Sequence, residues 1–296
     1  MSLSASSDSP SLLSWPTPLF HVNPTRRIQL KENVWRVESG TKKKSLKRYD
    51  SYYLFQKVVD IHQSLSEINF PHILPLSSDF TSLEIMQPWV QTNSVHQFES
   101  SVIRKRAWNA LKKLHNTNRV IDWQNVGNIP PFDLIKKWSY RIDQFHKYQD
   151  FIEHYLGKKL FQLIASSAST FTEKLTPFST DSNTLLHGDI VHHNFIFAEK
   201  ETYLIDFDLA CLGNEKQEEI LLFHRFLPYM NYHLPQLIYE FPEAEELVDY
   251  LKIPNEIMRE WIYAAKLPES QLPIAIPRLR AFTQKAMPQF QNLWYN

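Results

Sequence analysis

The first ninety residues alternate between strand-like and helix-like patterns of apolar and polar positions. Residues 26–49 contain two short strand-like runs around the turn signal Ser39-Gly40-Thr41, which predicts a β-hairpin. Residues 51–67 instead place apolar side chains at helical spacing, which predicts a helix with one face against a core. The apolar positions on that face are Leu54, Val58, Ile61 and Leu65.

Short apolar runs elsewhere predict further strands. Residues 72–76 and 83–90 form two such runs with a polar turn between them, and Pro88 predicts that the second strand leaves its sheet there. A second compact β segment is expected near the middle of the chain. There Phe195-Ile196-Phe197 and Tyr203-Leu204-Ile205 flank a Glu199-Lys200 turn, which predicts another hairpin.

The rest of the chain has a helical pattern. Apolar residues between 102 and 115 predict one amphipathic helix, and residues 132–175 continue the helical periodicity with an interruption near Gly157. Residues 176–183 form a polar linker, and the chain beyond 213 consists of helical segments punctuated by prolines. We therefore expect a mainly helical second part.

This order of elements predicts an α+β protein with two lobes. Residues 1–18 are rich in Ser and Pro and are expected to form a flexible leader. We assign 19–90 to a small β-rich N-lobe with one helix, and 91–296 to a larger, mainly helical C-lobe. A chain of 296 residues is long enough for both.

Composition narrows the functional classes. Lys plus Arg and Asp plus Glu both number 32, so the formal charge is zero, which argues against a nucleic-acid partner. The lone cysteine, Cys211, excludes an intrachain disulfide and is typical of a reducing compartment. We find no signal-peptide pattern and no window apolar enough to span a bilayer, so we expect a cytoplasmic protein without a membrane partner.

The candidate chemistry lies around the second predicted hairpin. Asp189 precedes Asn194 by five residues in the loop before this hairpin, and Asp206 follows at its far end. A hairpin brings its start and its end together, so both loops should face one cleft. Phosphoryl transfer needs one carboxylate to orient the acceptor hydroxyl, and an Asn with a second carboxylate to hold Mg²⁺ on the phosphates.

These segments resemble the aminoglycoside phosphotransferase and choline kinase-like family, with its HGDxxxxN and IDFxxA motifs. The matching residues are His187, Gly188, Asp189, Asn194, Ile205, Asp206, Phe207 and Ala210. Further segments match in the same order along the chain, namely 33–37, Lys47, 85–88 and 114–115. Within the family, the chain looks most similar to the branch of spore-coat kinase-like proteins.

The resemblance implies a bilobal protein-kinase-like fold with ATP or GTP and Mg²⁺ between the lobes. It implies that Asp189 orients the acceptor hydroxyl and that Asn194 and Asp206 bind the metal ion. Lys47 would contact the α- and β-phosphates of the nucleotide. The acceptor would lie over Asp189, walled by helices from residues 120–180 and from beyond 214.

The resemblance also implies supporting roles. Met86 and Gln87 stand where the family's nucleotide-binding hinge lies. Gly188 would be needed because the catalytic loop allows no side chain there, and His187 would brace that loop by hydrogen bonding. For Asp208, a structural role at the following turn is favoured over a direct part in the metal site.

Three positions depart from the family's pattern. The expected nucleotide loop, 29–33, contains no glycine, although backbone N–H groups approach phosphates most easily through glycine. Val58 occupies the place of the helix glutamate that pairs with the nucleotide-binding lysine, and Asp60 is the nearest acid. Either Asp60 substitutes, or the lysine is held differently, or the site is degraded. Glu218 or Glu219 would replace an Asp in the helix after the second motif.

The resulting hypothesis is an ATP/Mg²⁺-dependent phosphotransferase, a small-molecule kinase that phosphorylates a hydroxyl. The alternative is a catalytically weak or inactive pseudokinase that acts as a binding or assembly protein, which the glycine-free loop and missing glutamate favour. A metal-dependent hydrolase built on the cluster of His187, Asp189, His192 and His193 is disfavoured, because a zinc site needs converging ligands and adjacent histidines on an extended chain usually point apart. Cys211 is expected to be a packing residue.

The acceptor is expected to be a small molecule such as an aminoglycoside, an amino alcohol or a sugar-like compound. The acidic run 240–249 could attract a cationic acceptor, although such runs more often form a solvated helix face. Several aromatic residues could form a cation–π cage, although core packing is the commoner role. They are Tyr229, Tyr232, Trp261, Tyr263 and Trp294.

Overall fold

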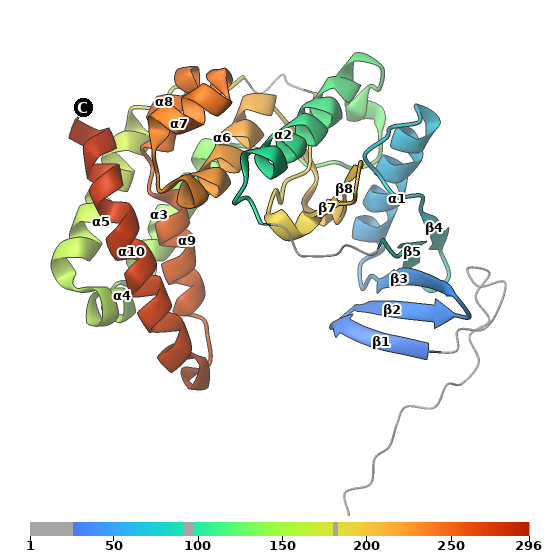
Figure 1. The fold of residues 1–296 in the computed structure, drawn as a ribbon, viewed down its shortest axis with the longest axis horizontal. Coiled ribbons are helices and arrows are strands. Elements are labelled where there is room, and N and C mark those ends of the chain that lie inside the picture. The colour runs from blue at the N-terminus through green and yellow to red at the C-terminus, as the bar shows by residue number, and fades with distance from the viewer. Residues whose placement is uncertain (1–25, 91–96, 180–182, 296) are drawn as a thin grey trace, which may run out of the picture.

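A computed structural model describes residues 26–90, 97–179 and 183–295, so the predicted leader, 1–18, lies outside the described residues. The chain has a β-sheet N-terminal region followed by a mainly helical C-terminal region (Figure 1). This arrangement confirms the predicted α+β class.

The N-terminal sheet is antiparallel and has the strand order β1-β2-β3-β5-β4. Its strands are β1 (Arg26–Lys31), β2 (Val34–Ser39), β3 (Lys42–Arg48), β4 (Ser77–Asp79) and β5 (Glu84–Pro88). The predicted hairpin is confirmed as β2–β3, whose register pairs Ser39 with Lys42 around Gly40. Gly40 adopts a φ of 57°, a left-handed conformation that glycine adopts without a steric cost.

One predicted strand is wrong. Residues 72–76 run as turns and irregular backbone, and the strand begins only at Ser77. Pro75 has no N–H to donate to a ladder, and the carbonyl oxygen of His72 instead accepts a hydrogen bond from the backbone of Leu204 at 2.8 Å. The segment thereby joins the sheet to the second hairpin. The prediction that the next strand ends at Pro88 is confirmed.

The helix predicted at 51–67 is confirmed as α1 (Tyr52–Glu67). Ser51 caps its N-terminus, because its hydroxyl oxygen accepts a hydrogen bond from the backbone N–H of Leu54 at 3.3 Å. The predicted apolar stripe faces the core, with Val58, Ile61 and Leu65 buried. The same buried face also carries Lys57.

The C-terminal region confirms the predicted helical pattern. Gly157, at a φ of 94°, separates two helices as expected, and Tyr148 marks another break that the periodicity did not reveal. The principal helices are α2 (Ser101–His115), α3 (Leu134–Lys147), α4 (Gln149–Leu156), α5 (Lys158–Glu173), α6 (Glu215–Phe226), α7 (Leu234–Glu240), α8 (Val248–Leu251), α9 (Asn255–Ala264) and α10 (Leu272–Tyr295).

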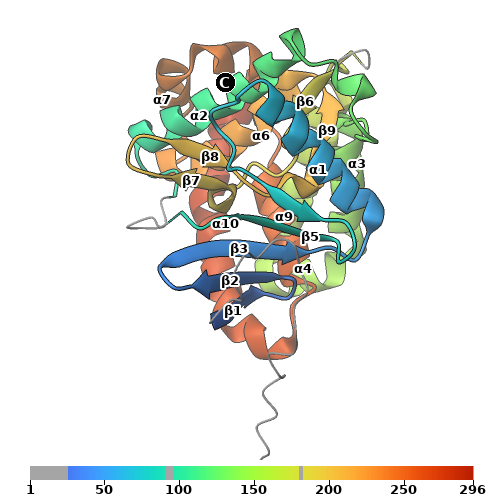
Figure 2. The same ribbon diagram turned by 90° about the vertical axis from the view of Figure 1, so that its right-hand side faces the viewer.

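The second predicted hairpin is confirmed as β7 (Phe195–Phe197) and β8 (Thr202–Leu204). Strand β6 (Thr184–Leu186) pairs with β9 (Cys211–Gly213), so the segment between them, which contains both motifs, starts and ends at neighbouring strands. Figure 2 shows the β7–β8 hairpin between the five-stranded sheet and α2. The motif loops therefore lie where the β-rich and helical regions meet.

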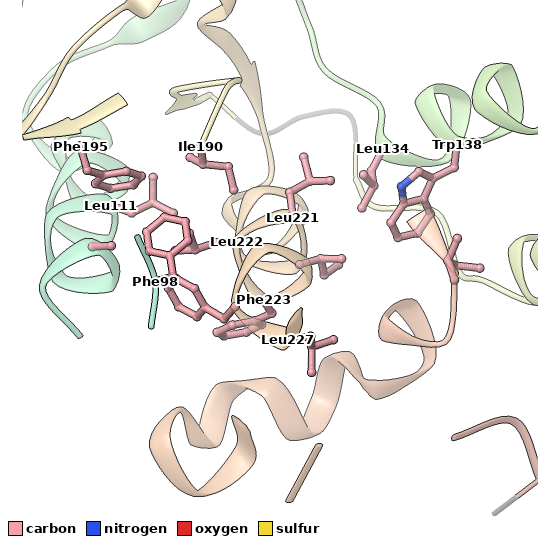
Figure 3. Close-up of a cluster of buried hydrophobic side chains, with 14 of the residues drawn as sticks. Phe98, Leu111, Leu134, Trp138, Ile190, Phe195, Leu221, Leu222, Phe223 and Leu227 are labelled. Carbon is pink, nitrogen blue, oxygen red and sulfur yellow. The ribbon is translucent and has the colours of Figure 1, made fainter. Parts of the chain in front are cut away.

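One large hydrophobic cluster supports these loops from the helical side. Phe98 is one of its buried members, with ring centroids 5.8 Å from Phe195 of β7 and 4.9 Å from Phe226 of α6. Figure 3 shows Phe98 among buried side chains of this cluster. Burial of such side chains stabilises a fold by about 1.5–3 kcal/mol each. Within the described ranges, no helix is long and apolar enough to cross a membrane.

Candidate active site

The structure brings together side chains that are far apart along the chain. The Lys47 Nζ of β3 lies 2.6 Å from Asp206 Oδ1 and 2.6 Å from Asp208 Oδ2. Tyr49, directly after β3, donates a hydrogen bond from its hydroxyl to Asp208 Oδ1 at 3.1 Å. Lys47 and Asp206 were both predicted at the site. Asp208 was expected to act at the following turn, and in the structure its carboxylate also pairs with Lys47.

The two carboxylates respond differently to this environment. Burial raises the pKa of Asp206, but the Lys47 ammonium and hydrogen bonds outweigh burial, so the pKa lies below its usual value. Burial and the neighbouring charge of Asp206 raise the pKa of Asp208 above its usual value, despite the attraction of Lys47. Asp206 is therefore the carboxylate that stays ionised most readily.

Asp189 and Asn194 lie in contact at the start of the hairpin. Asn194 Nδ2 donates to the backbone oxygen of Asp189 at 2.7 Å and to its Oδ2 at 3.1 Å. The backbone oxygen of Asn194 accepts from the Ile205 N–H at 3.0 Å, which sets this loop beside Asp206. The side-chain amide of Asn194 thus uses its nitrogen within the protein, and its oxygen has no hydrogen-bond partner among the described residues.

The donor set of these loops fits Mg²⁺. Mg²⁺ prefers oxygen ligands and is commonly held by one or two carboxylates together with substrate phosphates. The Asn194 Oδ1 and the ionised Asp206 carboxylate supply such oxygens from two neighbouring loops. Asp206 adopts a φ of 68°, an uncommon left-handed conformation for a residue other than glycine, of the kind that gathers at functional sites.

Gly188 sits where no side chain fits. A Cβ at this position would lie 1.8 Å from the backbone oxygen of Leu209, and the residue has a φ of 82°. The loop before Asp189 and the loop after Asp206 therefore approach each other more closely than any residue except glycine allows. This geometry matches the reason for which Gly188 was predicted.

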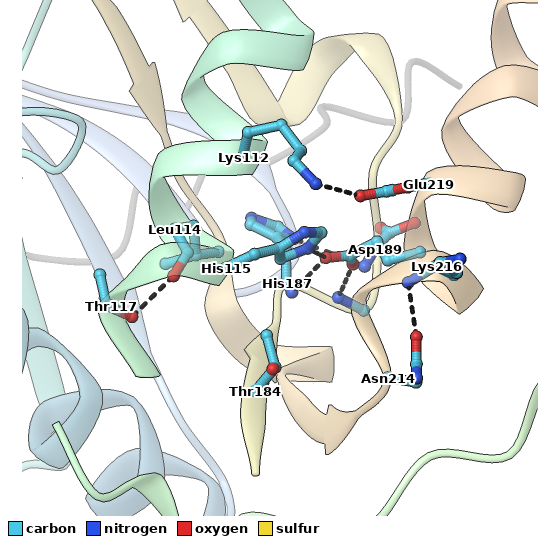
Figure 4. A network of polar contacts seen from close by, with 12 residues as sticks. Lys112, Leu114, His115, Thr117, Thr184, His187, Asp189, Asn214, Lys216 and Glu219 are labelled. Carbon is cyan, nitrogen blue, oxygen red and sulfur yellow. Dashed lines mark hydrogen bonds and ion pairs between the residues drawn. The ribbon is translucent and has the colours of Figure 1, made fainter. Parts of the chain in front are cut away.

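The buried carboxylate of Glu218, on α6, braces the loop that carries His187 and Asp189. Figure 4 shows His187 and Asp189 close to His115 of α2. Its oxygens accept the backbone N–H of His187 at 3.0 Å and that of Gly188 at 2.6 Å. His115 Nε2, at the end of α2, lies 2.9 Å from the same carboxylate. Burial raises the pKa of Glu218, but these hydrogen bonds and the nearby histidines more than offset it, so the net pKa is lowered.

Of the two acids expected in this helix, Glu218 occupies the bracing position. Glu219 instead pairs with Lys112 at 2.6 Å. His187 itself acts as a brace, because its Nε2 lies 2.9 Å from the backbone oxygen of Ile205 and thus ties the two motif loops together. The bracing role predicted for His187 agrees with this contact.

The lysine that lacks a helix glutamate is held differently. Asp60 does not substitute, because its carboxylate accepts from Gln56 at 2.6 Å rather than contacting Lys47. From α1 it is Lys57 that reaches the site, donating to the backbone oxygens of Asp208 at 2.7 Å and Ala210 at 3.1 Å. The only sequence signal for this contact is a lysine within the apolar face of the helix.

A cavity of about 540 Å³ lies between the sheet and the motif loops. Alternate residues of the strands face it, and these are Val34, Ser45, Lys47, Ile85 and Gln87. Met86 points to the opposite face, where it packs with Val37 and Leu46. Of the two predicted hinge side chains, Gln87 lines the cavity and Met86 does not.

The same cavity has lining residues that the sequence did not single out. Lys31, at the end of β1, adds a positive charge beside the glycine-free turn. His193 also lines it, and burial together with the Lys31 charge lowers the pKa of its imidazole. A spare cation at the loop can attract phosphate where backbone N–H groups of glycines are missing.

A second cavity, of about 620 Å³, adjoins the first across His192 and His193. Its other walls come from Phe98, Val191, the turn at Pro228 and Tyr229, and helices α6, α9 and α10. These helices belong to the range beyond residue 214 that was expected to wall the acceptor. Its lining includes no residue from 120–179, the described part of the range expected as the other wall.

Among the described residues, the histidine and cysteine candidates are arranged neither as a zinc site nor as an activated thiol. The rings of His192 and His193 are nearly perpendicular, at 84°. In the portions of the chain that are described, no group of three or more His, Cys, Asp or Glu side chains is arranged to hold a metal ion. Burial raises the pKa of the Cys211 thiol to about 12, so this residue stays protonated at neutral pH, as a packing residue does.

The fold and these two loops define a phosphotransferase. Residues 33–218 match the model of the phosphotransferase enzyme family, which is more than half of the chain, so the protein belongs to that family. This match confirms the predicted enzyme class. A search of curated proteins returned no match.

Solved structures support the same fold. The chain resembles the aminoglycoside phosphotransferase of Alicyclobacillus acidocaldarius, with 12% identity, 92% of each chain covered and a TM-score of 0.62. It is similar to an AMP-bound spectinomycin phosphotransferase, with 14% identity, 90% and 94% covered and a TM-score of 0.63. A choline/ethanolamine kinase family protein from Mesorhizobium loti shares 14% identity, with 95% and 92% covered and a TM-score of 0.54. A spore-coat branch is not tested by these likenesses and stays a prediction.

Proposed function

We propose that this protein transfers the γ-phosphate of ATP or GTP, in the presence of Mg²⁺, to a hydroxyl group of a small molecule. The observation that carries the proposal is that Lys47, Asp206 and Asn194 line one cavity, with Lys47 in contact with Asp206 and Asn194 in contact with Asp189. Phosphoryl transfer requires a cation at the phosphates, oxygen ligands for the metal ion and a carboxylate at the attacking hydroxyl. Lys47, the Asn194–Asp206 pair and Asp189 provide these three groups.

In this proposal the nucleotide occupies the first cavity. Lys47 leaves its two carboxylate partners for the α- and β-phosphates, which compete for the same ammonium. Asp206 is thereby freed to hold Mg²⁺ together with the Asn194 oxygen, and the metal ion would supply positive charge to the phosphates when bound. Asp208 and Lys57 keep the loop in place through Tyr49 and the backbone.

Asp189 orients the acceptor hydroxyl in this mechanism. Its carboxylate is fixed by the amide of Asn194, and its backbone follows the turn that Glu218 and Gly188 hold in position. A carboxylate at hydrogen-bond distance from the attacking oxygen aligns that oxygen and accepts its proton as its bond to the γ-phosphorus forms. The bond from that phosphorus to the β,γ-bridging oxygen breaks in the same transfer, and ADP or GDP leaves. Positioning and charge neutralisation supply most of the catalysis, because the transferred group carries high charge.

The similar proteins support the ligand classes. A spectinomycin phosphotransferase was solved with ADP and spectinomycin, and an aminoglycoside phosphotransferase with ADP and hygromycin B. A nucleotide and a small hydroxyl compound therefore fit together in this fold. The zero formal charge gives no reason to expect a nucleic-acid partner, and the lone cysteine is in keeping with a cytoplasmic site for the reaction.

The test is Mg²⁺-dependent ADP or GDP formation across a library of hydroxyl compounds. We expect at least one acceptor to stimulate nucleotide turnover, and Asp189→Asn to reduce that stimulated rate about 100-fold or more. Asp249→Asn, at an exposed carboxylate that pairs with Lys252, is the matched control and should keep the wild-type rate. No turnover with either nucleotide and any acceptor would favour the pseudokinase alternative.

A further inference from the structure

The second cavity contains charged residues that bear on the acceptor, a question that rests on the proposed function. Its lining carries three arginines, Arg225, Arg259 and Arg278, against two acids, Glu256 and Glu260. Counted as 3 − 2, these side chains contribute a net charge of +1. Its remaining walls are mainly apolar and aromatic.

Neither acid is free to receive a cation. Glu256 Oε2 accepts from Arg225 at 2.5 Å and from Arg259 at 3.0 Å, and Asn255 donates to its Oε1 at 2.8 Å. Glu260 pairs with Arg259. Both carboxylates are therefore already neutralised by guanidinium groups of the protein, and an ammonium group entering the cavity would have to displace one.

The arginines leave positive charge available. Arg278, exposed on α10, has no ion-pair partner among the described residues. Because Arg225 and Arg259 pair with the two acids, Arg278 supplies the net positive charge of the cavity lining. A guanidinium group recognises carboxylate and phosphate groups through paired hydrogen bonds.

The residues that could have favoured a cationic acceptor lie elsewhere. Within the acidic run 240–249, Glu240 pairs with Arg104 and Glu246 with Lys216, and no member of the run lines either cavity. Of the five aromatic candidates, Tyr229 and Tyr263 line the second cavity. The indole of Trp261 is fully buried and donates to Thr283 at 2.9 Å, so it belongs to the core.

We propose that the acceptor is a hydroxyl compound with an apolar body and an anionic group, a carboxylate or a phosphate, rather than a polycationic aminoglycoside. The apolar body packs on side chains such as Phe98, Leu279 and Phe282. Its anionic group pairs with Arg278 at the mouth of the cavity, and its hydroxyl extends past His192 and His193 towards Asp189. A cavity of this size suits one small organic molecule.

The test compares probes that share one scaffold and differ in charge. These are 4-(hydroxymethyl)benzoate, 4-(hydroxymethyl)phenyl phosphate, the neutral 4-(hydroxymethyl)benzamide and the cationic 4-(aminomethyl)benzyl alcohol. Binding to the full chain is measured by ligand-observed NMR at millimolar concentrations, with kanamycin as a polycationic comparison. We expect one or both anions to bind at least about threefold more tightly than the amine, the factor that one exposed ion pair supplies.

Arg278→Glu should reverse that order, because it places a carboxylate where the anion binds. Arg280→Glu makes the same change two residues further along α10, outside the cavity lining, and should preserve the wild-type order. Both positions are exposed, so thermal unfolding should be nearly unchanged in either variant. The two anionic probes separate a carboxylate acceptor from a phosphate acceptor.

Tighter binding of the amine or of kanamycin in the wild type would overturn the proposal. An order unaffected by Arg278→Glu, or no binding of any probe, would overturn it equally. Titrating ATP into the same samples distinguishes a failure of the proposed phosphotransfer from a failure of the proposed anionic acceptor. ATP binding without any preference for anionic probes rejects this inference alone, whereas the preference without ATP binding rejects the proposed phosphotransfer.

Discussion

The buried carboxylate of Glu218 allows the sharpest test of how the catalytic loop is held. Replacing Glu218 with Gln keeps the shape of the side chain but removes its charge and one acceptor oxygen. In the wild type the carboxylate serves three donors, the backbone N–H groups of His187 and Gly188 and the Nε2 of His115. In Glu218→Gln the amide NH₂ faces at least one of these donors. Solvent water does not reach that donor to replace the lost acceptor, because the Glu218 side chain is only 1% exposed.

The magnitude follows from these contacts. A hydrogen bond to a charged group contributes about 1.5–3 kcal/mol, and an unsatisfied buried donor costs about 1–3 kcal/mol. Breaking a buried charged pair by changing one partner typically costs about 3–5 kcal/mol. We therefore expect Glu218→Gln to lower the free energy of unfolding by about 3–5 kcal/mol. Because Gly188 precedes Asp189, we also expect turnover of an identified acceptor to fall by about tenfold or more.

Urea denaturation followed by tryptophan fluorescence measures the stability change. The control is Glu246→Gln, the same chemical change in an exposed pair with Lys216, which should alter the free energy of unfolding by less than about 1 kcal/mol. Equal, small effects of the two substitutions would mean that the buried carboxylate does not brace the loop. A stability loss with unchanged turnover would refute the link from Glu218 to Asp189.

Three further predictions concern separate parts of the fold. Gly188→Ala should destabilise the protein by at least about 2 kcal/mol and abolish turnover, because its Cβ would lie 1.8 Å from the Leu209 oxygen; a variant with wild-type melting and activity would contradict this contact. Lys57→Met should lower the free energy of unfolding by about 1–3 kcal/mol, because the backbone oxygens of Asp208 and Ala210 lose their hydrogen-bond donor. An unchanged midpoint of chemical denaturation would mean that Lys57 does not stabilise this loop. Burial lowers the pKa of His224 from 6.5 to about 4, so the unfolded chain binds a proton before the folded chain does as the pH drops. The free energy of unfolding should therefore fall by up to about 3 kcal/mol between about pH 6.5 and pH 4. Thermal melts across this range should show a shallower fall for His224→Gln, and identical slopes would contradict the assignment.

The features that could be predicted from sequence are those encoded locally. A stripe of apolar residues at helical spacing predicts helix α1. Gly40 at the turn predicts the β2–β3 hairpin. The Asp189 and Asp206 loops were recognisable because short motifs at fixed spacing flank a hairpin, and a hairpin brings its two ends together. Such signals depend on residues near one another in the chain.

The features that were missed depend on contacts between distant segments. The strand expected at 72–76 gave way to irregular backbone because the His72 oxygen is used by the second hairpin, more than a hundred residues away. The choice of Glu218 over Glu219 depends on which face of α6 meets the catalytic loop. The contact of Lys57 with the loop of Asp208 could not be inferred, because a lysine in an apolar stripe does not reveal which carbonyls it will reach.

In the proposed phosphotransfer, one site holds the nucleotide through Mg²⁺ at Asp206 and directs the acceptor through Asp189. The decisive experiment is calorimetric titration of ATP and GTP, each with and without Mg²⁺, into the wild type, Asp206→Asn and Asp189→Asn. We expect Mg²⁺-dependent binding in the wild type and in Asp189→Asn, and affinity reduced by about tenfold or more in Asp206→Asn. Binding of neither nucleotide to the wild type, or equal Mg²⁺-dependent affinity in the wild type and Asp206→Asn, would rule out this site for the nucleotide and its metal ion.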